Sequence, residues 1–263
     1  MEFRAAADGQ IEFRCSSSFA TLEDIRDEWD NFVESVGGDI YLSFDWCAIW
    51  WDSYGRGRQL RVFEYRCNGV LVGLLPMFVE TLWLGPCWLK TAKVVGSDFT
   101  IAMVNLPIRE DHSRVLIIQT IRELIEGEKC DAIHFGPLAE NYPALERLVE
   151  STSDSDRVEV LRNHVQSPYS LFSLPESFAK YMESLDNRQR GNLRRGRNLV
   201  ERELDLSLDL VTDMATIEHE IAQFIALHTA QWRQDGKQGH FNDWPEAGEF
   251  NTKMATKQAE RNR

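Results

Sequence analysis

The sequence is short of the features that assign a protein to a class at first sight. No run of about 18 apolar residues is present, which excludes a membrane-spanning helix. The N-terminal residues, Met1 to Gly9, contain no apolar core of the kind that a signal peptide needs. The five cysteines are odd in number, widely spaced and without a Cys-x-x-Cys pair, which is typical of buried thiols in a reducing compartment. We therefore expect a cytoplasmic protein.

The sequence also lacks the short motifs of several enzyme classes. It contains neither a Gly-x-Ser-x-Gly elbow nor a P-loop. The histidines are scattered without the spacing of metal ligands: His112, His134, His164, His219, His228 and His240. A formal net charge of −13 argues against a general nucleic-acid binder, because neutralising phosphates requires a basic surface. We expect no bound metal, and only a local basic patch could contact a nucleic acid.

One segment, residues 176–203, departs from this acidic background. It carries six arginines between Arg188 and Arg202 against a single acid, Glu201. At about 100° per residue, its apolar residues fall on one side of a helix: Phe178, Tyr181, Met182, Leu185, Leu193, Gly196, Leu199 and Val200. The arginines form two rows along the borders of this stripe, Arg190, Arg194 and Arg197 on one and Arg188, Arg195 and Arg202 on the other.

Two interpretations of the arginine rows remain open. Arginines at the border of a helix often extend their stems along the surface or pair with acids, of which the chain has 42. Alternatively, guanidinium groups that flank a buried face reach a groove and hold an anion by forked hydrogen bonds. Gly191 and Gly196 favour the second interpretation, because each glycine inside a helix costs about 1 kcal/mol relative to alanine. Close approach of a ligand or of another backbone would explain that cost.

The rest of the chain mixes strand and helix patterns. In order we expect a strand at 11–16, helices at 21–36 and 44–54, strands at 60–65 and 70–78, more strand over 82–104, a helix at 110–126, a strand at 132–135, a helix at 142–150, and strands at 157–162 and 168–173. Asn68-Gly69 predicts a tight hairpin. The pattern then begins again, with a strand at 204–211, a helix at 213–234 and a helix from about 245 to the end. We interpret this as an internal repeat whose second copy is cut short.

This β-α-α-β-β-β-α-β-α-β-β order is the one used by GNAT-type acyltransferases. Short segments, in order and spacing, resemble the two-lobed BioF2-like/CelD-like GNAT family, which is related in architecture to the FemAB aminoacyl transferases. They are Trp29, Phe44-Asp-Trp46 with Trp50, Gly73-Leu-Leu-Pro-Met77, Gly96-Ser-Asp98, Leu185-Asp-Asn-Arg188, Asn192-Leu-Arg-Arg195, and His228, Trp232, Gly236 and Gly239-His-Phe241. The resemblance implies an α/β fold with a mixed sheet flanked by helices. It divides the chain into a GNAT-like lobe (1–174), an arginine-rich connecting helix (175–203) and the start of a second, incomplete GNAT-like lobe (204–263).

The resemblance implies transfer of an acetyl or other acyl group from acyl-CoA to an amine or hydroxyl of a small-molecule or saccharide acceptor, with links to the synthesis of polysaccharide or envelope. In GNAT enzymes an R/Q-x-x-G-x-G/A loop before the third helix anchors the CoA diphosphate at the helix N-terminus. Residues 104–112, at the equivalent junction, contain no glycine. We therefore expect the first lobe not to bind the cofactor, and the donor site to lie in the second lobe, beyond the part of it present in this sequence.

Few residues are candidates for the chemistry itself. His228, one helical turn before Trp232, is either a general base near the acceptor or a packed, hydrogen-bonded core histidine. Asp98 either orients the acceptor or only shapes a turn through its own backbone. The expected substrate- and anion-binding residues are Trp232, Arg188, Arg190, Arg194, Arg195 and Arg197.

Three functions remain open on the sequence alone. The leading one is acyl transfer by a GNAT enzyme, with acetyl-CoA as co-substrate and no metal. The second is aminoacyl-tRNA-dependent transfer of the FemAB type, in which the arginine helix contacts tRNA, a partner that the acidic composition does not favour. The third is a catalytically inactive lobe that serves as a binding or scaffold module, and the missing anchor loop supports it.

Overall fold

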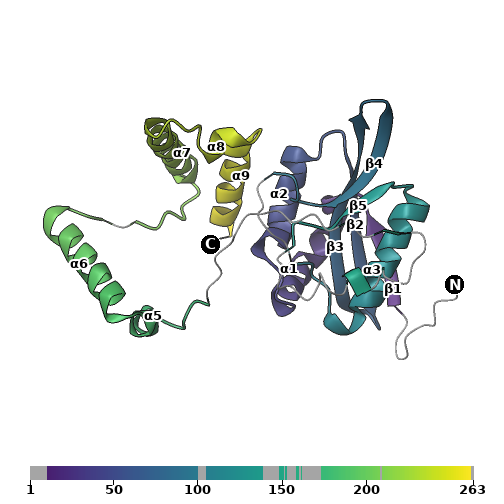
Figure 1. Cartoon of the computed structure of the whole chain (residues 1–263), viewed down its shortest axis with the longest axis horizontal. Helices are drawn as coiled ribbons and strands as arrows, with labels where there is room; N and C mark the ends of the chain where they lie inside the picture. The colour runs from purple at the N-terminus through teal and green to yellow at the C-terminus, as the bar shows by residue number, and fades with distance from the viewer. Residues whose placement is uncertain are drawn as a thin grey trace. The chain divides into compact units, whose positions relative to one another are not determined.

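A computed structural model describes residues 11–99, 105–138, 148–150, 152, 158–159, 161, 173–207 and 209–261. These residues fall into two compact units (Figure 1), one within Met1–Val160 and Thr212–Arg263 and the other within Leu161–Val211. The larger unit contains a five-stranded sheet, formed by β1 (Ile11–Ser16), β2 (Gln59–Cys67), β3 (Val70–Leu84), β4 (Cys87–Val94) and β5 (Ala132–His134). Its helical segments are η1 (Phe19–Ile25), α1 (Arg26–Ser35), η2 (Ile40–Leu42), α2 (Phe44–Tyr54), η3 (Glu110–His112), α3 (Ser113–Arg122), η4 (Glu123–Gly127), α7 (Ile217–Gln234), α8 (His240–Asp243) and α9 (Ala247–Glu260).

The sheet is mixed, and its spatial order follows the chain, β1-β2-β3-β4-β5. The first four strands are antiparallel neighbours, whereas β5 runs parallel to β4. A parallel pair needs a long crossover, and α3 with its flanking turns provides it. The observed fold is therefore mixed α/β, with a five-stranded sheet flanked by helices.

The hairpin between β2 and β3 forms where the sequence predicts it. Asn68 and Gly69 have φ angles of 51° and 78°, which is the backbone that an Asn-Gly hairpin turn requires. β3 continues to Leu84, further than the expected end at residue 78. Of the strand expected over 82–104, residues 82–84 belong to β3 and Cys87–Val94 form β4, whereas 100–104 lie outside the described residues. The predicted turns at Gly85-Pro86 and at residues 96–98 bound β4 on its two sides.

Helices cover both faces of the sheet (Figure 1). Trp50 of α2 packs on Phe78 of β3 with ring centroids 5.4 Å apart, whereas on the opposite face the hydroxyl of Tyr65 lies 2.7 Å from Thr120 of α3. Because both faces are covered, β3 is buried continuously from Leu71 to Val79. The expected helix 44–54 has the observed bounds of α2, but the expected helix 21–36 is divided into η1 and α1.

The C-terminal helices of the larger unit pack on one another, and α9 packs on α2. Phe250 of α9 contacts the rings of Trp46 and Tyr54 at centroid distances of 5.6 and 5.8 Å, and Lys253 contacts Asp52 at 2.6 Å. The expected helices over 213–234 and from about 245 correspond to α7 and α9. Among the helices that the structure describes, none has both the length and the apolar character to cross a bilayer.

Residues 173–207 of the smaller unit contain two helices, α5 (Phe178–Ser184) and α6 (Asn187–Glu203), where one continuous helix over 176–203 was expected. That expectation was wrong because the helical spacing of the apolar residues continues across Asp186, which ends one helix pattern by capping the next helix. Leu185 and Asp186 are extended, and the Asp186 carboxylate accepts a hydrogen bond from the Gln189 backbone N–H at 2.7 Å, which begins α6.

The expected strand over 204–211 is not observed, because residues 204–207 and 209–211 belong to no strand. Leu204, Leu206 and Leu210 alternate as a half-buried strand would, yet all three are exposed. Alternation without a pairing strand does not make a sheet. The helix expected over 142–150 and the strands expected over 157–162 and 168–173 fall largely outside the described residues.

Candidate functional site

Four charged side chains converge beside the C-terminal end of β4, and we call them the charge cluster: Arg58, Glu80, Lys93 and Asp98. Arg58 contacts Asp98 at 2.5 Å and Glu80 at 3.0 Å, and Lys93 contacts Glu80 at 2.6 Å and Asp98 at 3.1 Å. Their side chains are 14, 10, 19 and 16% exposed, in the order listed. Two cations and two anions thus form a closed, neutral ring that is mostly shielded from water.

The sheet register places these side chains together. Lys93 of β4 lies opposite Phe78 of β3, and Glu80 follows two residues later on the same face. Arg58 comes directly before β2, and Asp98 lies in the turn that Gly96 opens with a φ of 88°. Each residue is therefore fixed by a strand or by a turn at a strand end.

Arg58 is held by rings as well as by carboxylates. Its guanidinium carbon lies 4.6 Å from the centre of the Phe78 ring and 5.7 Å from that of Trp50. Its Nη1 atom is buried and has no hydrogen-bond partner among the described residues. Arg58 is thus a rigid donor whose Nη1 amino group is unused among the described residues.

Asp98, the turn residue singled out from the sequence, belongs to this cluster. Its Oδ1 accepts from Lys93 and its Oδ2 accepts from Arg58. A carboxylate whose two oxygens already accept from cations is better placed to orient a neighbour than to remove a proton. Its proposed role toward an acceptor stays a prediction.

Lys93 and His134 face each other across the parallel pair of β4 and β5. Burial lowers the pKa of Lys93, but its hydrogen bonds with Glu80 and Asp98 outweigh burial and raise the pKa overall. His134 is exposed at the end of β5, yet the protein around its ring removes part of its hydration; this partial desolvation, and then the charge of Lys93, lower its pKa. Near neutral pH, Lys93 is therefore charged and His134 is a neutral imidazole.

The second predicted residue pair, His228 and Trp232, lies on α7 in a cluster of rings. Trp232 donates its indole N–H to Nε2 of His228 at 2.8 Å, and Phe241 and His240 of α8 pack on the His228 ring at 5.0 and 5.5 Å. Gly239 fits here because a Cβ atom at its position would lie 3.2 Å from Trp232, and its φ of 81° disfavours other residues.

This geometry limits what His228 can do as a base. An indole N–H can only donate, so Nε2 of His228 is the acceptor and the neutral ring carries its proton on Nδ1. Nδ1 is buried and without a hydrogen-bond partner in the described part of the chain. His228 can take up a second proton only by giving up its bond to Trp232, and its role as general base stays a prediction.

The predicted arginine set lies on α6 of the smaller unit, where no described residue is buried. Three members make local contacts: Arg190 with the Leu185 carbonyl at 2.9 Å, Arg195 with Asn192 at 2.5 Å and Arg197 with Glu201 at 2.7 Å. Gly191 and Gly196 have no atom within 4 Å of their Cβ positions. Within the described residues, no neighbouring backbone explains these glycines, and the helix surface is open to a ligand.

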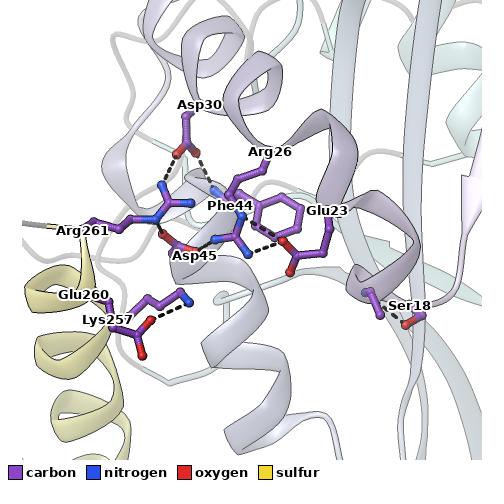
Figure 2. Close-up of polar contacts among 10 residues, drawn as sticks. Ser18, Glu23, Arg26, Asp30, Phe44, Asp45, Lys257, Glu260 and Arg261 are labelled. Atoms are coloured by element: carbon purple, nitrogen blue, oxygen red, sulfur yellow. Dashed lines mark hydrogen bonds and ion pairs between the residues drawn. The ribbon is translucent and has the colours of Figure 1, made fainter.

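A separate ionic network fastens the chain after α9 to α1 and α2 (Figure 2). Asp45 is 5% exposed and accepts from Arg26 and, at 2.9 Å, from Arg261. Asp30 accepts from the Phe44 backbone N–H at 2.8 Å, which caps α2, and lies 3.7 Å from Arg261. The buried carboxylate between two guanidinium groups serves to hold α9 in place.

The junction before α3, where a GNAT enzyme anchors CoA, can be tested against that ligand. Two of its backbone N–H groups are used within the protein: Asn105 donates to Asp39 at 2.6 Å, and Arg109 donates to the Val72 carbonyl at 2.9 Å. Glu110 and Asp111 begin the helical turn, and they also line a groove of about 1210 Å³. Carboxylates at this point repel a diphosphate. The residues present at this junction do not fit CoA.

Sequence reasoning singled out Asp98, His228, Trp232 and the arginines, whose roles stay predictions. It did not single out His134 or the other three members of the charge cluster. Glu80 and Lys93 could have been found from the sequence, because each is a charged residue next to a long apolar stretch predicted as strand. A charge in such a place is costly unless it is paired. Glu80 and Lys93 both pair with Arg58 or Asp98. Arg58 and Asp98 are 40 positions apart in the sequence, and only the sheet brings them together.

Comparison with known proteins adds little. No family model matches the chain, and no curated protein matches it. An integron cassette protein from the mobile metagenome of V. cholerae is 12% identical with a TM-score of 0.34, covering 59% of this chain and 93% of that one. A transcriptional regulator from Bacillus halodurans C-125 is 14% identical with a TM-score of 0.34, covering 59% of this chain and 100% of that one. Neither likeness is strong enough to support an inference about function.

Proposed function

We propose that this chain belongs to a GNAT-type acyltransferase, which transfers an acetyl or other acyl group from acyl-CoA to an amine or hydroxyl acceptor. The observation that carries the proposal is the sheet. Four antiparallel strands are followed by a fifth that is parallel to the fourth, with two helices after β1 and one between β4 and β5. This is the β-α-α-β-β-β-α-β order expected from the family resemblance.

The charge cluster and His134 form the acceptor side in this proposal. They lie at the C-terminal end of the β4–β5 pair, and the carboxyl ends of parallel strands are where α/β sheets commonly bind ligands. Lys93 and Asp98 orient polar groups of the acceptor. His134, held neutral near pH 7, can take up a proton from a bound amine or hydroxyl.

The junction before α3 does not fit a diphosphate, so the acyl donor is expected elsewhere. The sequence pattern places it in a part of the second lobe outside these residues; we propose instead that the guanidinium groups exposed on α6 hold its phosphates. The arginines of α6 remain the anion-binding set: Arg188, Arg190, Arg194, Arg195 and Arg197. Guanidinium groups bind phosphate by paired, charge-assisted hydrogen bonds. All members of this set except the half-buried Arg190 are exposed on α6 and accessible to a ligand.

Calorimetric titration of acetyl-CoA into the folded chain tests this proposal. We expect saturable binding that weakens about tenfold or more in the Arg194→Ala/Arg195→Ala variant, because each charge-assisted hydrogen bond contributes about 1.5–3 kcal/mol. The matched control, Arg14→Ala/Arg56→Ala, removes two exposed arginines of the larger unit and should bind as the parent does.

Two other functions have an observation in their favour. The exposed basic surface of α6 suits tRNA, as FemAB-type transfer would require. Salt-dependent tRNA binding that is lost in Arg194→Ala/Arg195→Ala, without acetyl-CoA binding, would support it. The carboxylates of Glu110 and Asp111 suit a non-catalytic lobe that serves as a binding or scaffold module. That function would be supported if the folded chain bound neither acetyl-CoA nor tRNA.

A further inference from the structure

The end of the β3–β4 hairpin is a two-stranded arm, residues 81–90. β2 pairs with β3 only up to Val79, and β5 pairs with β4 only from Thr91, so neither strand of the arm has an outer neighbour in the described sheet. Figure 1 shows this hairpin extending past its neighbours. At about 3.3 Å per residue, the four residues from Thr81 to Leu84 carry the arm roughly 13 Å beyond the sheet.

The arm exposes large apolar side chains on both of its faces. Trp83 and Trp88 are cross-strand partners on one face, 67 and 70% exposed, with ring centroids 6.5 Å apart. Leu84 and Cys87 are partners on the other face, and both are exposed. An isolated two-stranded hairpin is marginally stable in water, so apolar surface of this kind on an arm indicates a binding role.

The charge of the arm is unlike that of the rest of the protein. Residues 81–90, Thr-Leu-Trp-Leu-Gly-Pro-Cys-Trp-Leu-Lys, contain no acid in a chain that has 42, and their one charge is Lys90 at the base. Lys90 is itself engaged with Glu128 at 3.8 Å. No charged side chain in the outer part of the arm therefore opposes its transfer out of water.

We propose that this arm is a membrane-contacting element, which inserts its tip into the interface of a phospholipid bilayer. A flat protein surface would cover one face of the arm and leave the other exposed. The lipid interface surrounds the arm and covers both Trp83 and Leu84. Tryptophan is enriched at that depth because its ring is apolar and its N–H is polar.

The backbone limits how deep the arm can go. The outer edges of its two strands are unpaired, and unpaired backbone groups are not tolerated in hydrocarbon. The tip therefore rests at the boundary of headgroups and acyl chains, about 5–10 Å deep. A net charge of −13 repels an anionic surface. Binding is thus stronger to neutral phosphatidylcholine than to phosphatidylglycerol vesicles, and the difference shrinks as salt is added.

Flotation of the full chain with phosphatidylcholine vesicles tests the proposal. The Trp83→Ser/Trp88→Ser variant should partition about tenfold or more weakly, because the apolar area that enters the interface is largely removed. The matched control, Ile40→Ser/Val70→Ser, removes two exposed apolar side chains elsewhere in the same unit and should partition as the parent does. Circular dichroism and thermal melting establish that each variant is folded.

A second measurement leaves both tryptophans in place. A polarity-sensitive fluorophore on Cys87, in a Cys15→Ser background, should brighten when vesicles are added, whereas the same fluorophore on Cys15, in a Cys87→Ser background, should not. Equal responses at the two sites, or absence of vesicle binding by the folded parent, would overturn the proposal. So would sedimentation showing a dimer that Trp83→Ser/Trp88→Ser dissociates, because the arm would then bind a second copy.

Discussion

Arg58 and Asp98 lie 40 positions apart in the chain, yet a guanidinium N–H of Arg58 donates to the Asp98 carboxylate at 2.5 Å. Arg58 precedes β2 and Asp98 follows β4, so this contact ties together the two sides of β3. Lys93 and Glu80 complete the ring of charges. The charge cluster is thus both a set of contacts that stabilises the sheet and the candidate acceptor site. The two roles can be separated by experiment.

Asp98→Asn should destabilise the protein by about 1–3 kcal/mol, because it leaves two buried cations with a single carboxylate. Urea unfolding measures this change. Asp52→Asn is the matched control, since Asp52 is 69% exposed in its pair with Lys253 and should change stability by less than about 0.5 kcal/mol. Equal effects of the two substitutions would mean that the charge cluster does not contribute as a buried unit.

His134 should titrate below the ordinary value of 6.5 for histidine, because partial desolvation of its ring and the charge of Lys93 both lower its pKa. As pH falls, the unfolded chain takes up this proton before the folded chain does. The stability from His134 is therefore present above about pH 6.5 and is lost as pH falls toward the folded-state pKa. NMR titration of the imidazole measures the pKa, and Lys93→Gln should raise it. A pKa that stays unchanged in Lys93→Gln would contradict this electrostatic account.

Asp45→Asn should loosen α9, because it leaves Arg26 and Arg261 without their shared carboxylate (Figure 2). We expect a loss of about 2–4 kcal/mol in stability, somewhat below the roughly 3–5 kcal/mol that follows removal of one partner of a fully buried ion pair, because Arg26 and Arg261 are 15 and 20% exposed. Hydrogen exchange should accelerate in α9 more than in β2 and β3. Glu260→Gln, at an exposed position of α9, is the control, and unchanged exchange in α9 of Asp45→Asn would refute the role of the network.

Asp186→Ala should weaken the start of α6 by about 1 kcal/mol, because it removes the side chain that caps the helix. Hydrogen exchange at the Gln189 and Arg190 amides reports the change. Asp186→Asn keeps a capping side chain and should restore protection to near the parent level. If Asp186→Ala leaves this exchange unchanged, the boundary between α5 and α6 has another cause.

The elements best predicted from the sequence are those whose ends carry local signals. Gly55 follows α2, and Asn68-Gly69 sets the hairpin, so both were placed correctly. The division of the arginine-rich segment was missed because the apolar period masked the cap at Asp186. The expected strand at 204–211 failed because alternation predicts a strand only where a partner strand exists, and partners are not local information.

The candidate site was predictable only in part for the same reason. Asp98 stood out because it follows Gly96-Ser97 at the end of an apolar run, and His228 because it shares a helix face with Trp232. Arg58 carried no such signal. Its position over Phe78 and between two carboxylates depends on the pairing of β2 with β3 and of β3 with β4, which side-chain spacing along the chain does not encode.

Titration of the folded chain with acetyl-CoA tests the proposed function most directly. The account predicts saturable binding that is weakened about tenfold or more by Arg194→Ala/Arg195→Ala, unaffected by Arg14→Ala/Arg56→Ala, and unaffected by Asp111→Asn at the junction before α3. Absence of saturable binding by the folded protein would contradict it.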